Sequence, residues 1–339
     1  MSQQLVLVTG ITGFIAGHVT ERLIEQGYRV RGTVRASKYE KLSKENIPGL
    51  EFTQVNDLAT DDLTAALKGV SVVLHVAAPL PGKADAEGSI KTAVEGTLNV
   101  VRQAEKAGIT KIVVTSTFGN MFPPSLETAY SGVTLTDSDW GKTTKEEVIS
   151  NASNPFYVYF GSKNLAERAL WDFVAEHPNL DVTSINPGFV YGPYAKILPA
   201  PEGQGQLGSN IFNWMLLNGQ FPPAGMAPPW VIDVRDIAKA HVAAIKLDRY
   251  TPANTKRFLV NGSNFEWSEA AEAVRKAVPE ITTLPEANAY KALPGPAAIL
   301  DSSRAKKELG LDEFTPASQT FIDTLKDLAR LRSEWAAKA

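Results

Sequence analysis

Cysteine is absent from the 339 residues of this chain, and histidine is scarce. Without cysteine there can be no disulfide, no thiolate nucleophile and no thiolate metal site. The four histidines are too scattered along the sequence to form a metal-binding motif, so we predict no metal. They are His18, His75, His177 and His241.

An excess of one charge is also missing. Lys and Arg together number 34, Asp and Glu together number 37, and the formal net charge is -3. This balance argues against nucleic acid or an anionic membrane as a partner. No apolar run is long enough to span a bilayer, and the first residues, MSQQLVLVTG, lack the basic and long apolar regions of a secretory signal. We therefore predict a soluble, cytoplasmic protein.

Strand-like and helix-like segments alternate through the first half of the chain. Their alternation predicts an α/β fold in which a doubly wound, Rossmann-type parallel sheet is covered by helices on both faces. Strands are predicted at residues 5–8, 28–34, 51–55, 72–76, 111–115, 182–186 and 257–260. Helices are predicted over residues 14–27, about 87–107 and 233–247.

The alternation stops at residues 187–230, which are rich in Pro and Gly. A regular core cannot be built from such a stretch, whereas a substrate-facing lobe can. The tail from about Asn264 is mostly helical in pattern. We predict a dinucleotide-binding domain from residues 1–186 plus about 231–262. A smaller, mainly C-terminal substrate-binding lobe would comprise residues 187–230 plus about 263–339.

A glycine-rich turn joins the first predicted strand to the first predicted helix, in VTGITGFIAGH. Gly10 permits the tight turn, Gly13 lets the backbone approach a pyrophosphate, and the small Ala16 lets helix and strand pack closely. The helix N-terminus then offers free N–H groups to the phosphates. We expect Thr12, Phe14 and Ile15 to contribute to the same site. The alternative is a turn that serves packing only.

The end of the second predicted strand indicates which dinucleotide binds. An NAD site would place Asp or Glu there, but residues 30–38 read VRGTVRASK and contain no acid. Arg35 could pair bidentately with a 2′-phosphate, and Lys38 could assist. We therefore predict NADP as the cofactor. The alternative is that Arg35 is only a solvated surface charge.

Four further residues follow the third and fourth predicted strands. Asp57, next to Leu58, could accept a hydrogen bond from the adenine amino group, or it could cap the next helix. Ala77 and Ala78 are small enough for the cofactor to lie along their backbone; the alternative is that they serve close packing only.

Tyr159 and Lys163 lie four residues apart, on one face of a predicted helix. A phenol beside an ammonium is a proton donor whose pKa can be lowered toward neutrality. The fifth predicted strand ends in VVTSTFGN, which places Ser116 and Thr117 at the carboxyl end of the sheet. Ligands of open α/β sheets bind at that end, so we expect these hydroxyls and the phenol to converge.

The motifs TGITGFIAGH, TVRAS, VVTSTFGN, YFGSKNLAE, NPGFVYGP and IDVRDIAKAH occur in the order and spacing of the extended short-chain dehydrogenase/reductases. Within that family the chain resembles the dihydroflavonol-reductase-like branch, which includes yeast and fungal NADPH-dependent carbonyl and methylglyoxal reductases. The resemblance covers nearly the whole chain, down to DSSRAKKELGL near its end.

The resemblance implies a role for each matching residue. Tyr159 is expected to be the general acid that protonates the substrate carbonyl, and Lys163 to lower its pKa and bind the nicotinamide ribose. Thr117 is expected to donate a hydrogen bond to that carbonyl, with Ser116 as the alternative donor. Further predicted cofactor contacts are Thr115, Pro187, Gly188 and Val190.

Two positions depart from the family pattern. Ala16 replaces the third turn glycine, and Ala93 stands where many extended members have Asn. Asn99 matches a later Asn of the pattern, and we expect its role to be structural.

These features predict an NADPH-dependent reductase of a small ketone or aldehyde, acting as a monomer or homodimer. Its pocket would be lined by apolar residues that are equally good core residues. Two alternatives stay open: an NAD-dependent NDP-sugar epimerase or dehydratase, and a regulator that binds NADP without turnover. The candidate pocket residues are Phe118, Met121, Phe160, Phe189, Tyr191, Met215 and Trp230.

Overall fold

The structure is a computed structural model that describes residues 3–78, 82, 84–249 and 256–338. Within these residues, seven parallel strands form a central sheet in the order β10-β7-β5-β4-β1-β2-β3. The strands are β1 (Leu5–Val8), β2 (Arg29–Val34), β3 (Leu50–Gln54), β4 (Val72–His75), β5 (Lys111–Thr115), β7 (Asp181–Pro187) and β10 (Lys256–Val260). The predicted Rossmann-type α/β fold is confirmed. Because β1 pairs with both β2 and β4, the strand order reverses there, where such sheets bind ligands.

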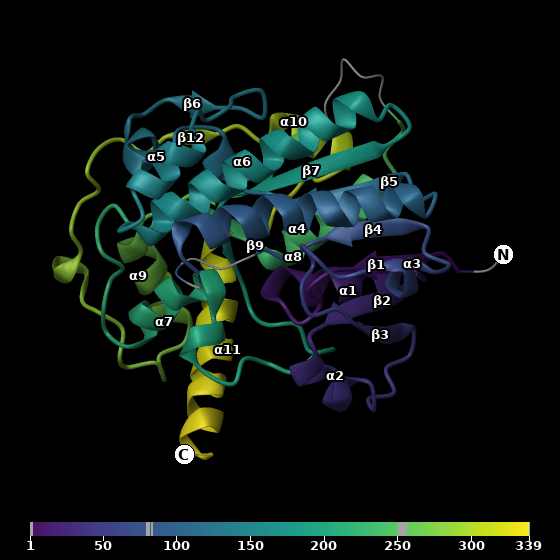
Figure 1. Ribbon diagram of the computed structural model, residues 1–339. Helices are drawn as coiled ribbons and strands as arrows, with labels where there is room; N and C mark the ends of the chain where they lie inside the picture. Colours follow the sequence, from purple (N-terminus) through teal and green to yellow (C-terminus); the bar gives the residue numbers. More distant parts are fainter. Residues whose placement is uncertain (1–2, 79–81, 83, 250–255, 339) are drawn as a thin grey trace.

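Helices cover both faces of this sheet (Figure 1). On one face lie α4 (Ala86–Lys106) and α6 (Pro155–Glu176), and on the other lie α1 (Phe14–Glu25) and α8 (Val234–Ile245). Both faces need covering because each carries apolar side chains. In strand β1, for example, successive side chains point to opposite faces. Leu5 and Leu7 join the core under α4 and α6, whereas Val6 and Val8 join the core under α1 and α8.

Three short helices complete this half of the chain. α2 (Ala36–Leu42) follows β2, α3 (Thr64–Leu67) precedes β4, and α5 (Lys145–Ser150) precedes α6. A capping box, in which Thr144 and Glu147 bond each other's backbone, starts α5.

The lobe beside the sheet is built on a second, aromatic core (Figure 1). The rings of Tyr191, Trp230 and Trp267 are fully buried in it. Its helices are α7 (Ile211–Leu217), α9 (Trp267–Ala277) and α11 (Ala317–Ala336). Small sheets frame it: β8 (Val190–Tyr191), β9 (Trp230–Asp233) and β11 (Ser263–Asn264) form one, and β6 (Thr134–Leu135) pairs with β12 (Ile299–Leu300). Short 3-10 turns occupy Phe118–Asn120, Leu126–Tyr130, Gln204–Gln206, Gly208–Asn210 and Ala287–Ala289.

The two cores do not follow the chain in simple blocks. Phe118 and Leu135, from the first half of the sequence, belong to the aromatic core of the lobe. Conversely, α10 (Ser303–Leu309) buries Ala305 and Leu309 in the core under α8. The predicted domain boundaries at residues 186, 230 and 262 stay a prediction, and these two segments pack across them.

A search of the described residues for membrane-crossing helices finds none of sufficient length and apolar character.

Candidate active site

The glycine-rich turn has the geometry of a phosphate cradle. Gly10 has a φ of +63°, and a Cβ atom there would lie 2.8 Å from the Cβ of Ala77. Gly13 occupies the N-cap position of α1 without a side chain to bond the first N–H groups. The first turn of α1 carries no acidic residue, so its positive dipole end stays available to an anion. The turn therefore fits the pyrophosphate of a dinucleotide.

The other residues predicted around this turn lie on its accessible side. Thr12, Phe14 and Ile15 are half-buried. The Phe14 ring centroid lies 5.1 Å from that of Tyr194, so the lobe closes against this end of α1. Ala77 is half-buried and Ala78 is exposed.

Arg35 directly follows β2, at the N-cap position of α2, and Lys38 lies in the first turn of that helix. Both side chains are exposed. Neither has a hydrogen-bond or ion-pair partner among the described residues, in contrast to Arg31 on the same strand, which pairs with Glu51 at 2.6 Å. Arg35 is thus free to receive a phosphate. The predicted pairing of Arg35 with a 2′-phosphate stays a prediction.

Asp57 does not cap a helix, because α3 begins only at Thr64. That alternative was wrong. Its carboxylate accepts from the Ala59 N–H at 2.9 Å and is exposed. Asn99 holds the same loop by donating to the carbonyls of Leu58 (2.9 Å) and Asp61 (3.2 Å), so its bonds are structural.

Lys163 is held by α6, which starts where Asn154 accepts hydrogen bonds from two N–H groups and Pro155 takes the first helical position. The side chain is buried, and its Nζ donates to the carbonyl oxygen of Thr115 at 2.9 Å. Burial lowers the pKa of Lys163 to about 8, although the charge of Glu167 acts in the opposite direction. The ammonium is therefore fixed at the carboxyl end of β5.

Tyr159 lies one turn before Lys163 and is half-buried. Its ring packs at 5.4 Å from the Phe160 ring, and its hydroxyl has no hydrogen-bond partner among the described residues. Burial raises the pKa of Tyr159 to about 12. The predicted lowering of this pKa by Lys163 stays a prediction. The phenol keeps its proton at neutral pH, as a donor requires.

Ser116 and Thr117 point in opposite directions, as neighbours on extended backbone do. The Ser116 hydroxyl accepts from Nδ2 of Asn120 at 2.7 Å, beneath the surface of the site. The Thr117 hydroxyl accepts from the Gly119 N–H at 3.2 Å, which leaves its own proton free to donate. This arrangement favours Thr117 over Ser116 as the carbonyl's hydrogen-bond donor.

Thr115 contacts the site through its backbone rather than its side chain. Its hydroxyl lies 2.7 Å from Nε2 of His241 on α8. Nδ1 of His241 donates to the Ile237 carbonyl, so Nε2 accepts the Thr115 proton. The predicted cofactor contact of Thr115 stays a prediction, and its hydroxyl already has this partner.

We expect the two fully buried histidines near this strand end to make the protein acid-sensitive. Burial lowers the pKa of His75 to about 3 and that of His241 to about 4, from 6.5. As pH falls below 6.5, the unfolded chain binds protons that the folded protein does not, so stability falls. The loss between pH 6.5 and pH 5 should be on the order of 3 kcal/mol. Urea unfolding at the two pH values measures it, and equal stabilities would contradict the assignment.

The segment after β7 returns to the same edge of the sheet. Pro187, Gly188 and Val190 are buried there. Gly188 packs closely on Asn261, because a Cβ atom would lie 2.2 Å from Oδ1 of that side chain. Their predicted contacts with the nicotinamide stay a prediction.

The apolar residues predicted to line the substrate pocket belong to the aromatic core of the lobe or pack against it. The ring of Phe118 lies 5.4 Å from that of Phe160, 5.3 Å from that of Phe189 and 4.9 Å from that of Trp230. Three aromatic rings thus pack around Phe118, the residue after Thr117. Met121 and Tyr191 are likewise buried, whereas Met215 is half-buried. Direct contact with substrate stays a prediction for each of them.

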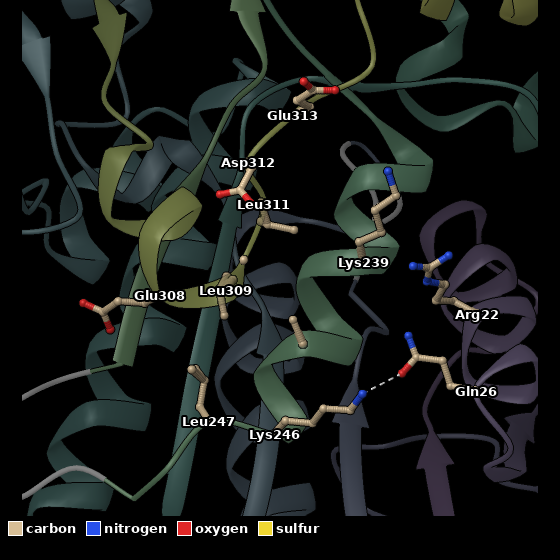
Figure 2. A pocket seen from close by; sticks show the side chains of 12 residues that line it. Arg22, Gln26, Lys239, Lys246, Leu247, Glu308, Leu309, Leu311, Asp312 and Glu313 are labelled. Atoms are coloured by element: carbon tan, nitrogen blue, oxygen red, sulfur yellow. Dashed lines mark hydrogen bonds between the residues drawn. The ribbon is translucent and has the colours of Figure 1, made fainter.

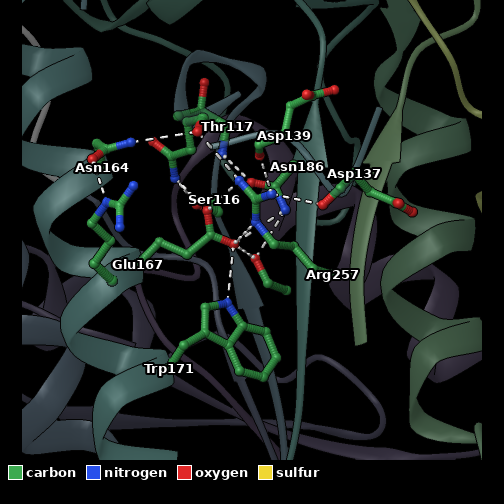
Figure 3. A network of polar contacts seen from close by, with 12 residues as sticks. Ser116, Thr117, Asp137, Asp139, Asn164, Glu167, Trp171, Asn186 and Arg257 are labelled. Carbon is green, nitrogen blue, oxygen red and sulfur yellow. Dashed lines mark hydrogen bonds and ion pairs between the residues drawn. The ribbon is translucent and has the colours of Figure 1, made fainter. Parts of the chain in front are cut away.

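Sequence reasoning missed the polar network beneath the site, which centres on Glu167 (Figure 3). Its carboxylate accepts from Ser184 Oγ and Asn120 Nδ2, both at 2.5 Å, and from Arg257 Nε at 3.1 Å. A signal was present, because Tyr159, Lys163 and Glu167 follow one another at four-residue intervals on α6.

A cleft of about 780 Å³ lies elsewhere, between α1, α8 and residues 308–313 (Figure 2). Arg22, Lys239 and Lys246 line one side of it, and acidic side chains line the other. None of the predicted site residues is among its lining residues.

Known proteins resemble the chain over nearly its whole length. Aldehyde reductase 2 of Sporidiobolus salmonicolor is 32% identical over 302 residues, which are 82% of each chain. The crystal structure of yeast methylglyoxal/isovaleraldehyde reductase Gre2 complexed with NADPH matches with a TM-score of 0.80 and 25% identity, over 97% of this chain and 99% of that one. Gre2 of Candida albicans in complex with NADPH matches with a TM-score of 0.80 and 27% identity, with the same coverage.

A family model agrees with these relatives. The model of the NAD dependent epimerase/dehydratase family matches residues 6–255. The predicted resemblance to the extended short-chain dehydrogenase/reductases is thereby confirmed. The chain belongs to the NAD dependent epimerase/dehydratase family.

Proposed function

We propose that this protein reduces a ketone or aldehyde to an alcohol, with NADPH as the hydride donor. The observation that carries the proposal is the grouping of three side chains at the carboxyl end of β5. Thr117 follows that strand, Lys163 bonds the carbonyl of its last residue, and Tyr159 lies one helical turn from Lys163. Relatives that are named as reductases, two of them solved with NADPH, support the same reaction.

Each group has a distinct task. NADPH, when bound, supplies a hydride to the carbonyl carbon. Tyr159 gives its phenolic proton to the carbonyl oxygen, so that the product is an alcohol. The Thr117 hydroxyl donates to the same oxygen and stabilises the negative charge that develops there. Lys163 binds the ribose and favours the phenolate that remains after proton transfer, because its ammonium is held nearby.

The residues of the turn and the neighbouring loops fit NADPH. The pyrophosphate would lie against Gly10, Gly13 and the N-terminus of α1, where a Cβ atom at residue 10 has no room. The 2′-phosphate would pair with Arg35, and the adenine amino group with Asp57.

Replacing Arg35 tests the cofactor assignment. Arg35→Ser should weaken NADPH binding about tenfold or more and leave NADH binding unchanged, because a charge-assisted hydrogen bond to phosphate is lost. Titration of the fluorescence of each reduced cofactor measures both affinities. Lys41→Ser, on the exposed face of the same short helix, is the matched control. A wild-type protein that uses NADH and NADPH equally well contradicts this role.

The reaction itself is tested by following NADPH oxidation at its near-ultraviolet band with a panel of carbonyls. Short dicarbonyls, aryl ketones, β-keto esters and a dihydroflavonol sample the main classes. We expect oxidation that depends on the carbonyl with at least one class. No oxidation with any class counts against the proposal.

The two alternatives have less support. An NDP-sugar epimerase would retain NAD tightly, but the position after β2 holds Arg35 rather than an acid. NAD found bound in the purified protein would favour it. A regulator without turnover has no use for Tyr159 and Lys163 together.

A further inference from the structure

Glu167 is a fully enclosed anion behind the proposed catalytic residues. Its side chain is 1% exposed, as is that of its ion-pair partner Arg257. Burial alone would raise the pKa of Glu167, but Arg257 and the hydrogen bonds from Ser184 and Asn120 outweigh it and lower this pKa. The carboxylate is therefore ionised at neutral pH.

The guanidinium of Arg257 has further partners besides Glu167, so the buried ion pair is held in a fixed arrangement. Its NH1 donates to the carbonyls of Asp137 (2.7 Å) and Asp139 (2.6 Å), and its guanidinium lies 3.6 Å from the centre of the Trp140 ring. This binding keeps the Glu167 carboxylate in one place.

Glu167 faces Lys163 along α6. The two residues are one helical turn apart, and their side chains line the same small cavity together with Thr97 and Ser116. The charge of Glu167 acts to raise the pKa of Lys163, against the effect of burial.

The other groups around Lys163 carry no compensating negative charge in the described part of the chain. Tyr159 on α6 is protonated, and His75 on β4 is neutral because burial lowers its pKa to about 3. Thr115 on β5 contributes a carbonyl oxygen. Glu167 is thus the anion that opposes the burial of this ammonium.

The same carboxylate is connected to the other proposed catalytic segment. Asn120 donates to Glu167 and to the Ser116 hydroxyl, at 2.5 Å and 2.7 Å. The side-chain amide of Asn186 hydrogen-bonds both the Thr117 backbone and the Glu167 carboxylate. Figure 3 shows Ser116 and Thr117, which follow β5, together with Asn186 of β7 and Arg257 of β10 around Glu167.

We propose that Glu167 is a positioning residue for the reaction, acting as the internal counter-charge that keeps Lys163 protonated while it fixes the backbone of Thr117. The role of Glu167 in the reaction rests on the proposed function. Its effect on the protonation of Lys163 does not, and that effect can be measured without any substrate.

The decisive experiment is a titration of Lys163 by NMR in cofactor-free protein carrying ¹³C at the lysine ε carbons. A Lys163→Arg variant assigns the resonance. In Glu167→Gln we expect the Lys163 titration to move to lower pH by about one unit, because the opposing anion is gone. Glu176→Gln removes the same charge from the exposed end of α6 and should leave the titration unchanged.

A second variant keeps the test interpretable if Glu167→Gln alone fails to fold. Glu167→Gln leaves the Arg257 charge buried without its partner, whereas Glu167→Gln with Arg257→Gln removes both charges. The double variant should also show a lowered Lys163 titration. An unchanged titration in either folded variant overturns the inference.

Activity separates this inference from the proposed function. If the enzyme is active, the pH at which kcat falls on the alkaline side should shift to lower pH in Glu167→Gln. The shift should equal that of the Lys163 titration, because reduction fails where the lysine loses its charge. A wild-type protein that reduces no carbonyl contradicts the proposed function. An unshifted pH profile in an otherwise active Glu167→Gln contradicts the counter-charge.

Discussion

Tyr159→Phe should reduce carbonyls about 100 to 10,000 times more slowly than the wild type, because in the proposed reaction the phenol of Tyr159 is the general acid. NADPH affinity and thermal stability should stay close to wild-type values. The hydroxyl has no hydrogen-bond partner among the described residues, and a Phe ring keeps the packing on Phe160. Steady-state NADPH oxidation gives the rate, and cofactor fluorescence gives the affinity.

Tyr157→Phe provides the matched control for this change. Tyr157 lies on the same helix, is also half-buried, and is two residues away, so it faces a different side. Its variant should keep full activity. If Tyr159→Phe is as active as Tyr157→Phe, another group delivers the proton.

Thr117→Val should lower kcat about 100- to 1,000-fold, because it removes a preoriented hydrogen bond to the oxygen that becomes negative. Valine has nearly the same shape, so the packing around the site is retained. Thr117→Ser keeps the hydroxyl and should keep most of the activity. The comparison of kcat across the three proteins is the measurement.

Ser116→Ala decides between the two neighbouring hydroxyls. Ser116 accepts a hydrogen bond from Asn120 beneath the site, so its loss should cost about 1 kcal/mol of stability and little activity. A Ser116→Ala enzyme that is slower than Thr117→Val would transfer the donor's role to Ser116.

The sheet could be predicted from the sequence because its strands are apolar runs that end at the same edge. Each predicted strand overlaps a strand of the sheet, and every boundary lies within one residue of the prediction. The small strands β8 and β9 could not be predicted, because they lie in or at the end of the Pro- and Gly-rich stretch. They pair with each other although about forty residues, including α7, separate them in the sequence.

Parts of the candidate site could be predicted where the local sequence alone determines the geometry. Gly10 with its left-handed backbone, and Lys163 on the helix face toward β5, follow from local pattern. The pKa of Tyr159 did not, because it depends on burial by a lobe whose packing no local pattern reveals. Glu167 was missed for a related reason: its partner Arg257 lies 90 residues away in the sequence.

That separation has a consequence for how the protein is made. A ribosome that adds about 5 to 20 residues per second releases Arg257 on the order of ten seconds after Glu167. Until β10 takes its place at the edge of the sheet, α6 carries an anion that it cannot bury without its cation. Helix α6 can therefore pack stably only when most of the chain has emerged. A nascent chain that stops before β10 holds every proposed catalytic residue and still lacks a formed site.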